Sequence, residues 1–153
     1  MTTITQRKAN REDLPAIIEL YVQAGLEQEE KVNLSDSERV WERMQQYPAY
    51  AVYLAVQAGE VVGTFALLIM DNLAHHGTPA GIVEDVAVSP AHQGQGIGTA
   101  MMQFAMEECS KAECYKLSLS SNLKREAAHQ FYEGLGFIKH GYSFVVEMGA
   151  AVK

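Results

Sequence analysis

The chain has 153 residues, of which 48% are hydrophobic and 20% charged, and its formal net charge is −7 at pH 7. This length suits one globular domain with its own core, so we expect a single domain over residues 1–153. The acidic balance argues against a nucleic-acid-binding surface and mildly favours a cationic partner such as an amine. The longest apolar run, 64–70, is too short to cross a bilayer, and the N-terminal sequence lacks the apolar core of a secretory signal.

Apolar spacing predicts ten elements along the chain. Asn10 is predicted to be a helix N-cap, and the pattern at 35–38 predicts a capping box for a second helix. Gly25 and Gly136 are predicted to end helices by taking the left-handed backbone conformation. Strands and helices are mixed along the chain, and this mixture predicts an α+β (mixed α/β) layer fold. The elements are a strand at 3–8, a helix between Asn10 and Gly25, a helix at about 36–46, strands at 50–56, 61–70 and 83–88, a helix at 96–111, a strand at 115–120, a helix at 126–135 and a final strand at 142–148.

The stretch 82–100 organises the chain. A short β-branched strand ends at Ser89-Pro90, and a turn with glycines at 94, 96 and 98 then opens a long helical pattern. Alternate glycines let a backbone approach a ligand closely, and unpaired N–H groups at a helix start attract an anion, most often a phosphate. Thr99 follows the last glycine without the lysine of a Walker A loop, and the spacing is not that of a dinucleotide fingerprint. The alternative is an ordinary turn whose glycines serve tight packing.

Gln93, Gly96 and Gly98 fit the pattern Gln/Arg-x-x-Gly-x-Gly/Ala, in which the sequence resembles the GCN5-related N-acetyltransferase (GNAT) family. A second segment, CYKLSLSSNLKREAAHQFYEGLGF from Cys114, resembles the family's other diagnostic motif. Its matching residues are Asn122, Ala127 or Ala128, Phe131-Tyr132, Gly136 and Phe137. The two segments cover about 82–137. Locally they are similar to glucosamine-6-phosphate and aminoalkylphosphonate N-acetyltransferases, which differ in substrate and so do not identify the acceptor.

The resemblance implies a GNAT acyl-CoA N-acyltransferase fold, with a mainly antiparallel central sheet, a splayed strand pair and about four flanking helices. It also implies acetyl-CoA as cosubstrate. The glycine turn would bind the pyrophosphate, the edge of the strand at 86–88 would receive the pantetheine arm, and Asn122 would hydrogen-bond that arm. Asn122 could equally be a turn residue. The cofactor-binding candidates are Val86, Ala87, Val88, Gln93, Gly94, Gln95, Gly96, Ile97, Gly98, Thr99 and Asn122.

Tyr132 and Glu84 are the catalytic candidates. A phenol with a pKa near ~10 can protonate a departing thiolate and stay protonated at neutral pH, although Tyr132 could instead be a core aromatic. An alkylamine must lose a proton before it attacks, and Glu84 could accept that proton through a water. Several family members carry their base two residues earlier, where this chain has Ile82. Consecutive strand residues point to opposite faces, so we expect only one of Glu84 and Asp85 to reach the cleft.

These features predict an acetyl-CoA-dependent N-acetyltransferase that acts on a primary amine of a small molecule by direct attack in a ternary complex. The alternatives are a non-catalytic acyl-CoA-binding sensor and a protein or peptide N-acetyltransferase. We expect a homodimer, without nucleic acid or membrane as partner. Cys109 and Cys114 read as reduced residues of a cytoplasmic protein. We expect no metal site, because adjacent histidines such as His75 and His76 seldom face one point; they fit an exposed loop at 71–79.

Overall fold

The computed structural model describes residues 2–149, and the chain divides into two compact units, Met1–Leu119 and Ser120–Lys153. The first unit holds a five-stranded sheet in the order β1-β2-β3-β4-β5. Neighbouring strands are antiparallel except β4 and β5, which are parallel. This confirms the predicted α+β architecture. The strands are β1 (Ile4–Lys8), β2 (Tyr50–Gln57), β3 (Glu60–Met70), β4 (Ala80–Val88) and β5 (Lys116–Ser118).

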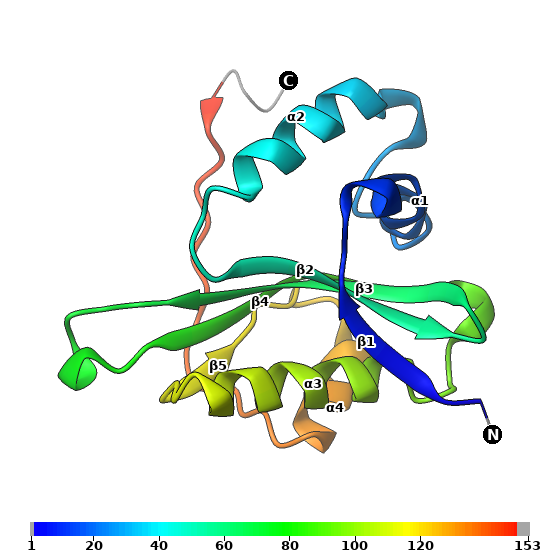
Figure 1. Cartoon of the computed structure of the whole chain (residues 1–153). Helices are drawn as coiled ribbons and strands as arrows, with labels where there is room; N and C mark the ends of the chain where they lie inside the picture. The colour runs from blue at the N-terminus through cyan, green and yellow to red at the C-terminus, as the bar shows by residue number, and fades with distance from the viewer. Residues whose placement is uncertain (1, 150–153) are drawn as a thin grey trace. The chain divides into compact units, whose positions relative to one another are not determined.

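Helices cover both faces of this sheet. Helices α1 (Leu14–Gln23) and α2 (Leu34–Met44) lie over one face, and α3 (Ile97–Lys111) lies under the other (Figure 1). Short 3-10 turns connect the elements. They are η1 (Arg11–Asp13), η2 (Glu29–Lys31), η3 (His75–Gly77) and η4 (Pro90–His92). The chain therefore builds a three-layer first unit before the second unit begins.

The two faces of the sheet bury different cores. On the upper face, Val52, Leu54 and Ala66 form a buried cluster with Leu14, Ile17 and Trp41 of α1 and α2. On the lower face the ring of Tyr53 lies 5.4 Å from Phe65 and 5.0 Å from Phe104 of α3. Burying aromatic rings of this size contributes roughly 1.5–3 kcal/mol each. This packing fixes the height of α3 below the sheet.

Local signals placed most helix ends correctly. Asn10 precedes η1, and its N–H donates to Asp13 Oδ2 at 2.8 Å. Gly25 has φ of 78°, and the N–H of Leu26 donates to the carbonyl of Tyr21 at 2.8 Å, as a left-handed helix end requires. The capping-box prediction at 35–38 was wrong. Asn33 caps α2 instead, because its side chain accepts the N–H of Asp36.

The second unit contains one helix, α4 (Glu126–Gly134). Gly136 has φ of 101°, and the N–H of Phe137 reaches back to the carbonyl of Tyr132 at 3.1 Å, which confirms the predicted left-handed end. The predicted final strand at 142–148 was wrong. A β-rich sequence becomes a strand only when another backbone completes its ladder, and no strand forms among the described residues of this unit.

Candidate functional site

The glycine turn between η4 and α3 is open. Gly94 and Gly96 have φ of 79° and 82°, a conformation that side chains other than glycine rarely adopt. A Cβ added at either glycine would meet nothing within 4 Å. The glycines are therefore needed for the backbone path and not for tight packing, which disfavours the packing alternative. The residues from Gln93 to Gly96 are exposed, whereas the side chain of Ile97 is buried and anchors the start of α3.

The first turn of α3 leaves its backbone donors free. Gly96 is the N-cap and supplies no side-chain acceptor, and its carbonyl accepts only the N–H of Ala100. The amides from Gln93 to Thr99 find no hydrogen-bond acceptor among residues 2–149. Unpaired N–H groups with the positive end of a 15-residue helix behind them bind anions, and a phosphate is the usual occupant.

Beside this turn, β4 has a free edge. Its partner β5 pairs only with residues from Ala80 to Ile82, so within the first unit nothing pairs with the rest of β4 on that side. The N–H of Ser89 donates to Val62 on β3 at 2.8 Å. Because backbone directions alternate along an antiparallel strand, the N–H and carbonyl of Val88 then point away from β3. The edge at 86–88 can therefore accept an extended ligand as an additional strand.

A bulge interrupts β4 ahead of that edge. Ala66 and Thr64 of β3 lie opposite Glu84 and Ala87, so β4 has two residues, Asp85 and Val86, where β3 has one. Asp85 takes φ of 54°, which lies in the left-handed region that aspartate and asparagine tolerate better than most residues. An extra residue bends the strand and re-aims its side chains.

The strand register locates Glu84, while the expectation that only one of Glu84 and Asp85 reaches the cleft stays a prediction. Glu84 shares a cross-strand row with Ala66 and Val52, which belong to the core beneath α1 and α2. Both carboxylates are exposed, and both act on the Tyr50 hydroxyl. Burial raises the pKa of Tyr50, and the charges of Asp85 and Glu84 raise it further. Both carboxylates are therefore close enough to Tyr50 for their charges to disfavour its ionised form.

The charge of Asp85 also affects the phenol of Tyr21. Burial raises the pKa of this phenol most, and the charge of Asp85 raises it further. Tyr21 and Tyr50 both pack against the core cluster of the upper face, so their rings are held in place. The sequence signal for Tyr21 was only its position in an apolar helix stripe, and that pattern does not distinguish a core residue from one at a site.

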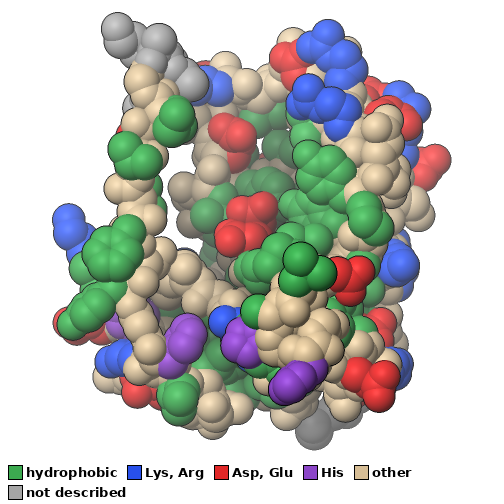
Figure 2. All heavy atoms as spheres, turned by 90° about the vertical axis from the view of Figure 1, so that its left-hand side faces the viewer, with side chains coloured by type: hydrophobic (Ala, Val, Ile, Leu, Met, Phe, Trp, Pro, Cys, Tyr) green, Lys and Arg blue, Asp and Glu red, His purple; other side chains and the backbone are tan. Residues whose placement is uncertain are grey.

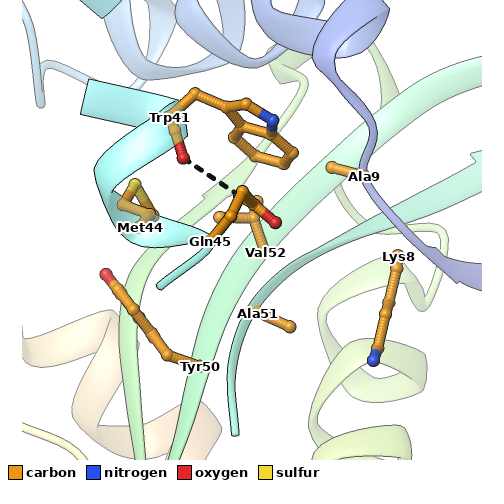
Figure 3. Close-up of a pocket in the computed structure, with 8 residues that line it drawn as sticks. All are labelled: Lys8, Ala9, Trp41, Met44, Gln45, Tyr50, Ala51 and Val52. Carbon is orange, nitrogen blue, oxygen red and sulfur yellow. Dashed lines mark hydrogen bonds between the residues drawn. The ribbon is translucent and has the colours of Figure 1, made fainter. Parts of the chain in front are cut away.

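A small cavity lies between the end of β1, the start of β2 and the end of α2 (Figure 3). It measures about 90 Å³ and is lined by Lys8, Ala9, Trp41, Met44, Gln45, Tyr50, Ala51 and Val52. Gln45 donates to the carbonyl of Trp41 at 3.1 Å across one wall. Glu84 and Asp85 do not line this cavity. On the face that includes the tip of the β3–β4 hairpin, acidic side chains lie among hydrophobic ones (Figure 2).

The remaining predicted site residues, Asn122 and Tyr132, belong to the second unit. The side chain of Asn122 accepts the N–H of Lys124 at 2.9 Å, and its carbonyl bonds to His129 at 2.8 Å. Its carboxamide oxygen thus closes the turn before α4. Burial raises the pKa of Tyr132, and the charge of Arg125 acts in the opposite direction. Tyr132 therefore stays protonated near neutral pH, as a general acid must. Its catalytic role stays a prediction.

Cys109 and Cys114 are free thiols. Burial raises the pKa of Cys109 to about 12, so its sulfur is protonated and a poor nucleophile at neutral pH. No group of three or more histidine, cysteine or acidic side chains gathers around one point in the part of the chain that is described. His75 instead stacks on Tyr115, with ring centroids 4.1 Å apart. None of the described helices has the length and apolar character to cross a bilayer.

The sequence model of the Acetyltransferase (GNAT) family matches residues 14–137 of this chain. An aminoalkylphosphonate N-acetyltransferase of Salmonella typhimurium is 36% identical over 91 residues, which are 60% of this chain and 58% of that protein. A glucosamine 6-phosphate N-acetyltransferase of Trypanosoma brucei brucei is 35% identical over 89 residues, 58% of each chain. The matched region thus spans less than two thirds of either relative.

The fold has close counterparts among solved structures. A protein from Agrobacterium tumefaciens str. C58 superposes with a TM-score of 0.88 at 29% sequence identity. The superposition covers 94% of this chain and 99% of the other.

Proposed function

Because the chain belongs to the GNAT family of acetyltransferases, we propose that it transfers an acetyl group from acetyl-CoA to a primary amine of a small molecule. The observation that carries this proposal is the row of free amides from Gln93 to Thr99 beside the open edge of β4. The amides suit a pyrophosphate, and the edge suits the extended arm that ends in the thioester. The names of the two relatives support an amine acceptor, since both are N-acetyltransferases of small molecules.

The reaction is a direct attack within a ternary complex. The neutral amine nitrogen attacks the thioester carbonyl carbon, and the C–S bond breaks as the C–N bond forms. The carbonyl oxygen becomes negative on the way, and a backbone N–H on the free edge of β4 would stabilise it. Cys109 is buried and protonated, so its thiol is not available as the nucleophile that would form an acyl-enzyme intermediate.

Two protons must move. An alkylamine with a pKa near ~10.4 is almost wholly protonated at pH 7, and losing its proton there costs about 4–5 kcal/mol. Glu84 is an exposed carboxylate on the upper face and would take this proton through a water. Tyr132 would give its phenolic proton to the departing thiolate and would be reprotonated by the second proton, which the nitrogen loses as the amide forms. Orienting the two reactants adds to the rate, because the attack becomes effectively unimolecular.

Cofactor binding is tested by titrating coenzyme A into the protein in a calorimeter. Gly96→Ala places a Cβ on a left-handed residue, which costs about 1–2 kcal/mol, and narrows the approach to the amides. We expect coenzyme A affinity to fall about tenfold or more. Gly59→Ala is the matched control, since Gly59 has φ of 77° and open space but lies in the β2–β3 hairpin. If coenzyme A gives no heat with the parent protein, the proposal is wrong.

Catalysis is tested with a panel of small amines and acetyl-CoA, following release of the free thiol. A substrate is expected to give thiol and acetylated amine in equal amounts. Binding of coenzyme A without turnover of any amine would instead indicate the non-catalytic sensor. Acetylation of peptides only would contradict the small-molecule acceptor.

A further inference from the structure

We infer that Cys109 and Cys114 are an oxidation site, at which a low-molecular-weight disulfide such as glutathione disulfide converts the two thiols into a reversible disulfide bond. Both residues are free thiols in this structure. The bond would link the last turn of α3 to the segment that leads into β5. This chemistry is separate from the proposed acetyl transfer, in which neither thiol takes part.

The backbone at the end of α3 holds the two cysteines close together. The N–H of Cys114 donates to the carbonyl of Cys109 at 2.9 Å, and the N–H of Glu113 donates to the carbonyl of Ser110. Glu113 takes φ of 59°, so the helix ends in a Schellman motif with its left-handed residue in place. Standard bond lengths at both ends of the 2.9 Å hydrogen bond limit the distance between the two cysteine Cα atoms to about 7 Å. Disulfides usually join Cα atoms about 4.4–6.8 Å apart.

The side chains at these two positions are neighbours. In a Schellman motif the residue after the left-handed one commonly packs against the helical residue whose carbonyl it reaches, and here both residues are cysteine. The sulfur of Cys109 occupies the space that a side chain at Gly81 of β4 would need, so the glycine leaves room for the thiol between α3 and the sheet.

The segments on both sides of the pair are held without the thiols. The end of α3 lies beside β5 (Figure 1), and β5 pairs with β4 from Lys116 onward. Between them, the N–H of Tyr115 donates to the carbonyl of Pro79 at 3.0 Å. Because each end of the bond is anchored separately, the disulfide can form without a large backbone movement.

Cys114 is the thiol that an oxidant meets first, since it is partly exposed whereas Cys109 is 5% exposed. The Cys114 thiolate attacks one sulfur of glutathione disulfide, forms a mixed disulfide and releases one glutathione thiolate. The Cys109 thiolate then attacks Sγ of Cys114 and releases the second glutathione thiolate. The two protons that the cysteines lose go to the two glutathione thiolates, and the two electrons reduce glutathione disulfide.

The second attack is the slow step. Burial raises the pKa of Cys109 most and the charge of Cys114 raises it next, to about 12. The mixed disulfide removes the charge of Cys114 and with it the second cause, but burial still keeps the thiolate fraction of Cys109 small. The glutathione adduct on Cys114 is therefore expected to accumulate before the internal disulfide appears.

The test incubates the full chain with glutathione disulfide at about pH 8.5, near the pKa of a free thiol. Samples are unfolded in urea that contains excess N-ethylmaleimide, and intact masses are measured. We expect a glutathione adduct first and then a species with neither glutathione nor maleimide. Peptide mapping should join residues 109 and 114, and dithiothreitol should restore both thiols.

Cys109→Ser and Cys114→Ser are the matched controls. Cys109→Ser should stop at the glutathione adduct, because no second thiol is present to displace it. Cys114→Ser should react much more slowly than the parent, because its remaining thiol is buried.

The exchange equilibrium against glutathione separates the folded motif from mere closeness in sequence. The equilibrium constant for the internal disulfide should be at least about tenfold larger in buffer than in urea, because the fold holds the two sulfurs together. Oxidised parent protein should accordingly unfold at a higher urea concentration than reduced parent protein.

Three results would overturn the inference: a glutathione adduct as the final product of the parent, disulfides only between separate chains, or an equilibrium constant that is equal in buffer and in urea. None of these measurements uses coenzyme A or an amine. Failure of the thiol test therefore leaves the proposed acetyl transfer untouched, and a protein that fails to bind coenzyme A can still form the disulfide.

Discussion

Glu84 of β4 lies opposite Ala66 of β3, and this is the last regular pair before the bulge, in which Asp85 takes φ of 54°. The bulge interrupts the regular alternation of side chains along β4. It also ends the regular ladder just before the edge proposed to hold the thioester. The roles of the individual side chains can be separated by the following experiments.

Glu84→Gln is expected to make acetylation depend on the fraction of acceptor that is already neutral. Its rate should then rise about tenfold per pH unit up to the pKa of the amine, near ~10.4, whereas the parent rate should rise less steeply. Thiol release measured from pH 6 to about pH 10 gives both profiles. Parallel profiles for the parent and the variant would show that Glu84 is not the base.

Tyr132→Phe is expected to lower kcat about 100-fold, because the thiolate then leaves without a proton donor. Since the protonated phenol is the active form and burial raises its pKa, the parent should keep this contribution below the pKa of a free phenol, near ~10. Coenzyme A affinity should stay unchanged. Tyr115→Phe, which removes a hydroxyl immediately before β5, from the ring that stacks on His75, is the control. Equal turnover of Tyr132→Phe and the parent would disprove the assignment.

Gly81→Ala is expected to destabilise the fold by about 1–3 kcal/mol. A Cβ at this position of β4 would overlap Cys109 Sγ of α3 and approach Leu117 of β5 to 3.2 Å. Urea unfolding measures the loss. The cost should shrink when Cys109→Ala is present, because the overlapping atom is gone. Gly134→Ala, with no neighbour within 4 Å, should not be destabilising.

Asp13→Asn is expected to cost about 1 kcal/mol at pH 7. Arg7 donates to both carboxylate oxygens of Asp13, at 2.8 and 2.9 Å, and this contact holds the pKa of Asp13 below its usual 3.8. A lowered folded-state pKa stabilises the protein above pH 3.8, and this stabilisation disappears as pH falls through the lowered value. Unfolding curves at pH 7 and below pH 3 test this.

Glu12→Gln changes the neighbouring exposed carboxylate and serves as the control for Asp13→Asn. Its cost should be smaller at pH 7 and should change little with pH. A cost for Asp13→Asn that persists in acid would mean that lost packing, and not lost charge, causes it.

Local sequence determined the helix ends and the glycine turn, because these features depend on the backbone conformation of a few adjacent residues. Gly25 and Gly136 end helices because a left-handed residue must stand there, and the turn through Gly94 and Gly96 opens α3 for the same reason. The cap of α2 was predicted wrongly at 35–38, because Asn33, two residues before Ser35, accepts the N–H of Asp36 and starts the helix earlier.

Contacts between distant residues decided the rest. The bulge at Asp85 depends on the pairing of β4 with β3, and a pattern that alternates every two residues contains no trace of an inserted one. The strand predicted at 142–148 has the right composition but no ladder partner in its unit. The sequence by itself thus determined the glycine turn and the family motif, because short-range backbone geometry requires those residues. Only the tertiary structure placed Glu84 in one row with Ala66 and Val52, on the face where Tyr21 and Tyr50 pack, because strand register and helix packing bring separate segments to one face.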